Sequence, residues 1–131
     1  MTKKFAVLFG IVFVLVGLLG FVPNPIVGSA TGALFQTDIL HNIVHLLIGV
    51  VLLFAAKSQS AAALWLKIWG AVYLVLFLDG LVQIHMTGDK LLGIVTANPA
   101  DTYLHLVLGI VLLIVGFAGG KSAMSMDKAT M

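Results

Sequence analysis

The sequence predicts an all-α fold, an integral membrane four-helix bundle made of two parallel helical-hairpin repeats. Three observations lead to this prediction. Of the 131 residues, 61% are hydrophobic and only 9% are charged, whereas a soluble domain is roughly 45–50% apolar and roughly 25% charged. Four separate apolar stretches are long enough to cross a bilayer as helices. Finally, the chain matches itself when it is shifted by 60 positions.

The four apolar stretches are the predicted membrane helices. They span Phe5–Val22, Ile39–Ala56, Ala61–Val82 and Thr102–Gly120. A hydrocarbon layer about 30 Å thick needs roughly 20 helical residues, and each stretch approaches that length. We therefore expect one four-helix transmembrane domain over residues 1–120, followed by a frayed cytoplasmic tail over residues 121–131. The long links Pro23–Thr37 and Gln83–Ala97 are expected to be outer loops, and Lys57–Ser60 a short inner turn.

The lysines predict the orientation of the helices. In this topology six of the seven lysines fall on one side of the membrane, and only Lys90 falls on the other. Because lysine and arginine are enriched in cytoplasmic loops, we expect both termini in the cytoplasm. Trp65 and Trp69 then lie near the inner interface and Tyr103 near the outer one, as in an aromatic belt.

An internal repeat relates the two halves of the chain. The shift by 60 positions aligns His45–Gly49 with His105–Gly109 without a gap. We therefore expect one repeat over about residues 5–56 and a second over about residues 61–120. Because each repeat crosses the membrane twice, both copies have the same orientation and are related by a pseudo-two-fold axis along the membrane normal. Parallel repeats of this kind are known among transport proteins.

Polar residues gather at the outer ends of the second and fourth helices. Asp38 and Asn98 lie 60 positions apart, and both residue types cap helix N-termini. Pro99 suits the first helical position, where its missing N–H costs nothing. Counting from these caps places His41 and Asp101 at the third helical position.

Two helix faces then carry candidate ligands, because residues four apart lie on one face of a helix. The residues are His41, His45 and Gly49 on the second helix, and Asp101, His105 and Gly109 on the fourth. Imidazole and carboxylate groups ligate Zn, Cu or Fe, so the three histidines and Asp101 are predicted metal ligands. Asp79, near the outer end of the third helix, is a further candidate because a carboxylate often orients a ligating imidazole.

A tetrapyrrole is the other cofactor that this pattern indicates. His45 and His105 would ligate one haem from opposite sides, and Gly49 and Gly109 would leave room for the macrocycle. Cysteine is absent from the chain, which excludes thiolate metal sites, iron–sulfur clusters and thioether-attached haem. The fourth histidine, His85, falls in a predicted loop and is expected to be exposed.

A structural role also explains these residues. Asp101 can complement the helix dipole, and His45 and His105 can form hydrogen bonds across the bundle. Gly49 and Gly109 can be positions where the second and fourth helices pack closely, because small residues permit close approach in membranes. Ionisable groups within membrane helices are nevertheless candidates for function, so the sequence leaves both interpretations open.

Three segments carry a family resemblance. They are Leu18–Pro23, His41–Gly49 and Ala100–Leu106. Together they resemble a bacterial family of small four-helix membrane proteins that is catalogued only as a domain of unknown function. The resemblance covers most of Phe5–Phe117, and its most specific part is the HNxxHLLIG element at His41–Gly49. It implies four helices in a multi-pass protein of the bacterial inner membrane, and it implies no activity.

The predicted function follows from these features. We expect a small non-enzymatic integral membrane protein, either an accessory subunit of a larger membrane assembly or a homo-oligomer, whose outer-side His/Asp cluster binds a metal or tetrapyrrole. The alternatives are a purely structural membrane subunit with packing histidines and a small transport or proton-relay module. No nucleotide-binding glycine loop or HExxH element is present, and no basic run indicates nucleic acid. The expected partners are the lipid bilayer and other membrane subunits or the protein itself.

Overall fold

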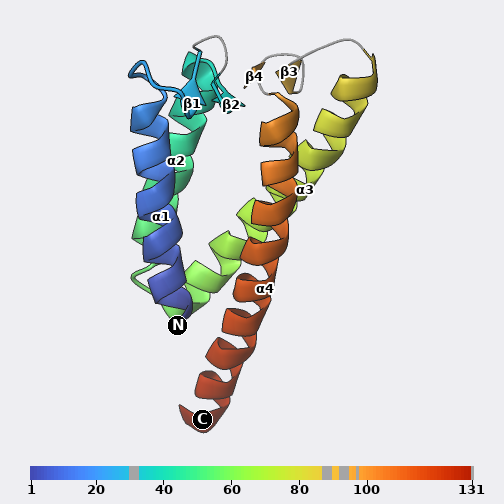
Figure 1. Cartoon of the computed structure of the whole chain (residues 1–131). Coiled ribbons are helices and arrows are strands. Elements are labelled where there is room, and N and C mark those ends of the chain that lie inside the picture. The colour runs from blue at the N-terminus through green and yellow to red at the C-terminus, as the bar shows by residue number, and fades with distance from the viewer. Residues whose placement is uncertain (30–32, 87–89, 92–94, 97, 131) are drawn as a thin grey trace.

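The computed structural model describes residues 1–29, 33–86, 90–91, 95–96 and 98–130, with side chains described in residues 1–29, 33–83 and 98–121. Its helices are α1 (Thr2–Leu19), α2 (Ile39–Ala55), α3 (Gln59–Met86) and α4 (Pro99–Thr130). They form one bundle (Figure 1). This arrangement confirms the predicted all-α fold with four helices.

The four helices are arranged as two antiparallel hairpins, α1–α2 and α3–α4. Each helix packs most extensively against the other helix of its own hairpin, and the two hairpins contact each other less. Figure 1 shows both chain termini at one end of the bundle and the short strands at the opposite end. The hairpin arrangement therefore agrees with the repeat that the sequence predicts.

The helices have the lengths and composition of membrane spans. Three of them contain spans that are long and apolar enough to cross a bilayer: Thr2–Leu19, Gln59–Gln83 and Pro99–Lys121. The remaining helix, α2, is also apolar. It has 17 residues, which is the lower end of the usual length of a membrane helix, about 17–25 residues. Large apolar side chains on the outside of the bundle stay exposed, among them Leu15 and Ile114. These surfaces suit lipid, so the protein is a membrane protein.

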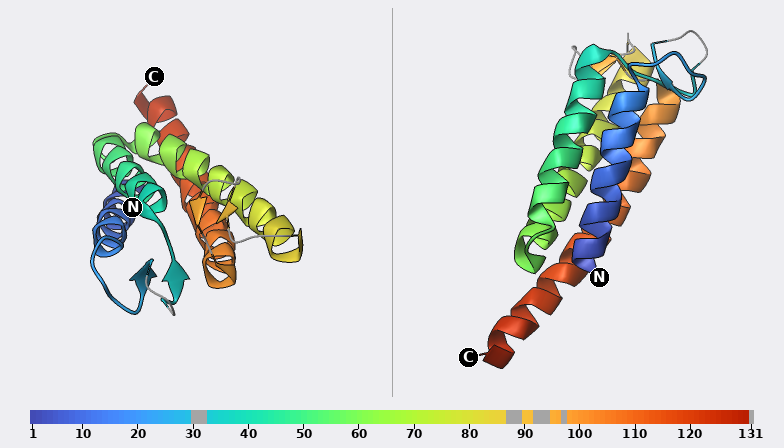
Figure 2. Two further views of the ribbon diagram at one scale, coloured as in Figure 1. Left: turned by 90° about the horizontal axis from the view of Figure 1, so that it is seen from above. Right: turned by 90° about the vertical axis from the view of Figure 1, so that its left-hand side faces the viewer.

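Helix α4 is longer than the sequence analysis predicted. It has 32 residues and, at about 1.5 Å per residue, is about 48 Å long. Figure 2 shows its C-terminal end extending beyond the other helices. The expectation of a frayed tail after Gly120 is therefore wrong, because lysine, alanine and methionine in this segment are good helix formers and no proline interrupts them.

Glycines let the backbones within each hairpin approach closely. A Cβ atom added to Gly49 would lie 2.7 Å from the carbonyl oxygen of Gly10 on α1, and one added to Gly109 would lie 3.1 Å from that of Gly70 on α3. The predicted contact of Gly49 and Gly109 between α2 and α4 is therefore wrong. Small residues do mediate close helix packing here, but they do so inside each hairpin.

The apolar core lies where the two hairpins meet. Its buried members are Phe13, Ile48, Leu52, Leu66, Tyr73 and Leu112. The rings of Phe13 on α1 and Tyr73 on α3 are stacked, with their centroids 5.7 Å apart. This stack joins the hairpins at a position that the 60-residue shift maps from one repeat onto the other.

The outer links contain short strands that the sequence analysis did not predict. In the first link β1 (Val27–Gly28) pairs in parallel with β2 (Phe35–Gln36), and in the second β3 (Lys90–Leu91) pairs antiparallel with β4 (Val95–Thr96). Helix α3 also continues through His85 to Met86, because helix-compatible residues extend up to Gly88. The expectation that His85 lies in a loop is therefore wrong, and its side chain lies outside the described residues.

Candidate metal centre between the hairpins

Equivalent caps begin α2 and α4 and set the positions of the candidate ligands. The Asp38 side chain accepts a hydrogen bond from the backbone N–H of His41 at 2.8 Å, and Asn98 Oδ1 accepts one from the backbone N–H of Asp101 at 3.1 Å. These bonds satisfy N–H groups that a helix leaves unpaired in its first turn. Both predicted caps are confirmed, and His41 and Asp101 occupy the third position of their helices.

Three of the predicted ligands meet between the hairpins. Asp101 Oδ2 lies 3.5 Å from Nε2 of His41 on the other hairpin and 3.5 Å from Nε2 of His105 on its own helix. One ligand atom from each of the three residues lies within 4.8 Å of the other two. The three residues are deeply buried, with exposed fractions of 3% for His41, 2% for Asp101 and 1% for His105. We call this group the His/Asp triad.

The two distances from Asp101 Oδ2 to the imidazoles are longer than direct hydrogen bonds and suit a shared ion. Protein N–H···O bonds are usually about 2.7–3.2 Å long, and Asp101 Oδ2 has no hydrogen-bond partner. Two atoms that are each about 2.1 Å from one tetrahedral Zn²⁺ lie about 3.4 Å apart. The separation of 3.5 Å between Asp101 Oδ2 and each imidazole therefore matches the edge of a tetrahedral coordination shell.

His45 lies beside the His/Asp triad but outside it. Its ring is 4.5 Å from the ring of His41 and 5.9 Å from that of Phe13, centroid to centroid. The residue is buried, and its Nδ1 atom has no hydrogen-bond partner. His45 thus faces the bundle interior as the sequence analysis expected, while His105 contacts Asp101 and His41.

Tyr73 is a site residue that the sequence analysis missed. It is buried, its ring centroid is 5.1 Å from that of His105, and its hydroxyl has no hydrogen-bond partner. The signal was present in the sequence, because Tyr73 carries the only hydroxyl group in the apolar stretch Ala61–Val82. It also lies 60 positions after Phe13, just as His105 follows His45.

The remaining predicted residues, Asp79, Gly49 and Gly109, do not belong to the triad. Asp79 on α3 is half-buried and is not part of the ligand group found among the described residues, so its role in orienting an imidazole stays a prediction. Gly49 contacts Val14 of α1, and Gly109 contacts Leu74 of α3. Neighbouring helices therefore fill the space beside these glycines that a tetrapyrrole would need.

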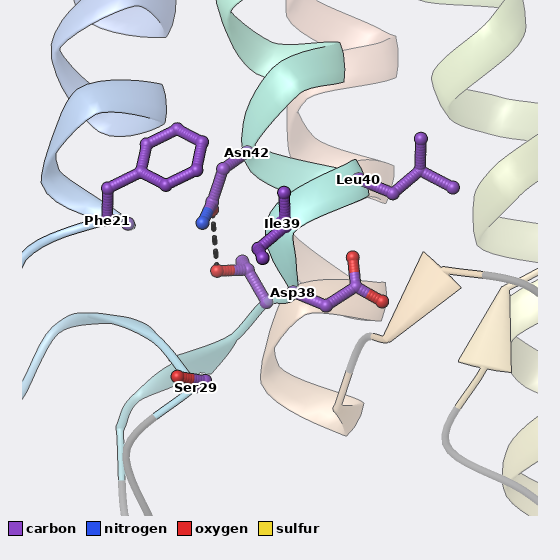
Figure 3. Close-up of a pocket in the computed structure, with 8 residues that line it drawn as sticks. Phe21, Ser29, Asp38, Ile39, Leu40 and Asn42 are labelled. Carbon is purple, nitrogen blue, oxygen red and sulfur yellow. Dashed lines mark hydrogen bonds between the residues drawn. The ribbon is translucent and has the colours of Figure 1, made fainter.

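A separate pocket of about 650 Å³ opens on the first hairpin beside the start of α2. Thr37 Oγ1 donates a hydrogen bond to Asn42 Oδ1 there, at 2.7 Å. Figure 3 shows that the carboxylate of Asp38 points away from Asn42. No member of the His/Asp triad lines this pocket, so it is distinct from the candidate metal centre.

Comparisons with known proteins agree with the fold and assign no activity. The chain matches the family described as Domain of unknown function (DUF4383) over residues 3–118. No curated protein and no solved structure matches it. The matched region includes most of each of the four helices and the whole His/Asp triad. The chain therefore belongs to the DUF4383 family.

Proposed function

We propose that the protein binds a transition-metal ion between its two hairpins, with His41, Asp101 and His105 as protein ligands. The observation that carries this proposal is the position of Asp101 Oδ2, which lies 3.5 Å from Nε2 of both histidines and has no hydrogen-bond partner. An ion between the three residues would be ligated by Asp101 Oδ2 and by Nε2 of both histidines. Without an ion, a buried carboxylate oxygen is left without a hydrogen bond, which is costly.

The chemistry of the donor set favours Zn²⁺, Cu²⁺ or Fe²⁺ as the ion. Imidazole suits these metals, and a mixed imidazole and carboxylate set is common in their sites. Calcium takes about six to eight oxygen ligands, and magnesium usually keeps several waters in an octahedral shell. The triad offers a single carboxylate within the described residues, so it suits neither of these ions.

A purely structural role for the same residues is the alternative. In that role the histidines would bond Asp101 directly, and the expected separation would be about 2.7–3.2 Å. The observed separation of 3.5 Å favours the metal. Whether the protein works as an accessory subunit of a larger assembly or as a homo-oligomer, and whether it resides in a bacterial inner membrane, stay predictions from the sequence.

Metal titration of the purified protein tests the proposal. The detergent-solubilised protein is treated with chelator and titrated with Co²⁺, whose visible absorption bands report tetrahedral coordination. We expect one Co²⁺ per chain. Asp101→Asn, which keeps the side-chain shape, and His105→Ala should each weaken binding by more than about 100-fold, beyond the effect of groups that only orient ligands.

His85→Ala is the matched control, because the sequence analysis does not count His85 among the predicted ligands. It should bind Co²⁺ as the wild type does. Elemental analysis of protein purified without chelator then identifies the native metal. If the wild type takes up no Co²⁺, or if Asp101→Asn binds it unchanged, the triad is not a metal centre and the structural role stands.

A further inference from the structure

In the part of the chain with described side chains, five buried polar atoms have no hydrogen-bond partner, and most of them belong to the His/Asp triad or to residues whose rings contact it. They are His45 Nδ1, Trp69 Nε1, Tyr73 Oη, Asp101 Oδ2 and His105 Nδ1. Almost all buried polar groups in proteins have a hydrogen-bond partner, so each of these atoms needs an explanation. An ion held by the triad accounts for Asp101 Oδ2, and the Tyr73 hydroxyl is one of the four atoms that it leaves to be explained.

The packing of Tyr73 does not require its hydroxyl. The Tyr73 ring stacks on Phe13 at 5.7 Å with an interplanar angle of 11°. Phe13 occupies the equivalent position of the first repeat and fills it with a ring that has no hydroxyl. A phenylalanine at position 73 would therefore pack as well, and burying the hydroxyl without a partner costs free energy.

The Tyr73 side chain adjoins the triad. Its ring contacts that of His105, with the centroids 5.1 Å apart, and its hydroxyl is buried without a hydrogen-bond partner. Tyr73 therefore borders the coordination shell from the interior of the bundle, and its hydroxyl can donate a hydrogen bond to a small molecule held there.

The triad leaves a coordination position unfilled by protein. Structural zinc sites are closed by four protein ligands, whereas reactive sites have three and keep a fourth position for water or substrate. His45 is the nearest further imidazole, but it is not a member of the group whose ligand atoms lie within 4.8 Å of one another. The protein therefore supplies three ligands from the described residues.

We infer that the ion keeps an exchangeable fourth ligand, a water or a small anion, and that this ligand accepts a hydrogen bond from the Tyr73 hydroxyl. The inference rests on the proposed metal site. It assigns that site to the class with three protein ligands and one exchangeable ligand. Tyr73 is then a positioning residue for the exchangeable ligand and does not ligate the ion.

Azide binding to the Co²⁺-loaded protein tests this inference. Azide is a small anion that ligates Co²⁺ and accepts hydrogen bonds, and its binding shifts the visible bands of the metal. The wild type should bind azide saturably. Tyr73→Phe should bind Co²⁺ as the wild type does, but azide about tenfold or more weakly, because a hydrogen bond to a charged ligand is lost.

Thermal unfolding of the metal-free protein adds a readout that separates this role from packing. Tyr73→Phe removes a hydroxyl without a partner, so the metal-free variant should melt at or above the wild-type temperature. Tyr103→Phe, at an exposed tyrosine with an exposed fraction of 55%, is the matched control and should change neither property.

Three results would overturn the inference, and they are distinguishable. Absence of Co²⁺ binding by the wild type removes the proposed metal site and the inference together. Normal Co²⁺ binding with no spectral response to azide means a closed site, with His45 as its fourth ligand. A response to azide that is equal in wild type and Tyr73→Phe means an open site in which Tyr73 has no part.

Discussion

At the scale of single residues, the candidate metal centre depends on an asymmetry between equivalent positions. His41 and Asp101 lie 60 positions apart, each at the third position of its helix and each followed four residues later by a histidine. The first repeat thus presents two imidazoles, and the second presents a carboxylate and an imidazole. Asp101 is the only carboxyl group at these four positions, and the two imidazoles beside it are those of His41 and His105.

This symmetry predicts that the two residues can be exchanged. His41→Asp and Asp101→His should each weaken Co²⁺ binding, because each places two side chains of the same kind at the equivalent positions, and the double variant should restore it. The exchange moves the carboxylate to the first repeat, where His45 follows four residues later as His105 follows Asp101. The double variant should therefore depend on His45 and no longer on His105.

Co²⁺ titration of the double variant, alone and combined with His45→Ala or His105→Ala, measures this dependence. A double variant that binds no metal, or one that still needs His105, would contradict the equivalence of the two positions. The His85→Ala substitution again serves as the control.

At the scale of helices, the same contacts recur in both hairpins at positions 60 apart. A Cβ added to Gly20 would meet Asn42, and one added to Gly80 would meet Thr102. Close backbone contacts of Gly49 with α1 likewise recur for Gly109 with α3. Each hairpin is therefore held together by glycines at equivalent positions, whereas His41 of one hairpin meets Asp101 of the other.

Adding a methyl group at these contacts should separate the helices of one hairpin. Gly49→Ala and Gly109→Ala should each destabilise the protein by about 1–3 kcal/mol, as overpacking usually does, because the new Cβ would lie within 2.8 Å of its nearest neighbour. Gly120→Ala is the control, because its Cβ would meet only the flexible end of Lys67 at 3.4 Å.

Thermal unfolding in detergent measures these effects. If Gly49→Ala and Gly109→Ala melt at the temperature of Gly120→Ala, the helices of each hairpin do not pack through these glycines in the membrane protein.

At the scale of the whole molecule, the bundle has a polar centre near one end. The His/Asp triad begins in the first turn of α2 and α4, at the end that carries the short strands in Figure 1. Both termini lie at the opposite end. If the lysine distribution sets the orientation, the candidate metal centre lies on the outer side of the membrane.

Reporter fusions test this orientation. A reporter fused after Met131 should be cytoplasmic, and one inserted near Gly88 should lie outside, because six of the seven lysines fall on the side of the termini. Alkaline phosphatase and green fluorescent protein are suitable reporters, since the first is active only outside and the second only inside. A C-terminal fusion with phosphatase activity would reverse the predicted topology.

The sequence by itself determined the four helices, their caps and the identity of the polar cluster. These features are local: apolar length predicts a span, and residue types such as Asp38, Asn98 and Pro99 predict where a helix begins. Because the caps set the count along each helix, the sequence also placed His41, His45, Asp101 and His105 on the faces where the structure has them buried.

Only the tertiary structure decided which faces meet. Gly49 and Gly109 face their own hairpin partners, and Tyr73 joins His105 from a third helix. The lengths of α3 and α4 also exceed what hydrophobicity alone indicates. The physical reason is that the periodicity of a helix determines which residues share a face. Which helix covers that face depends on packing between segments far apart in the chain.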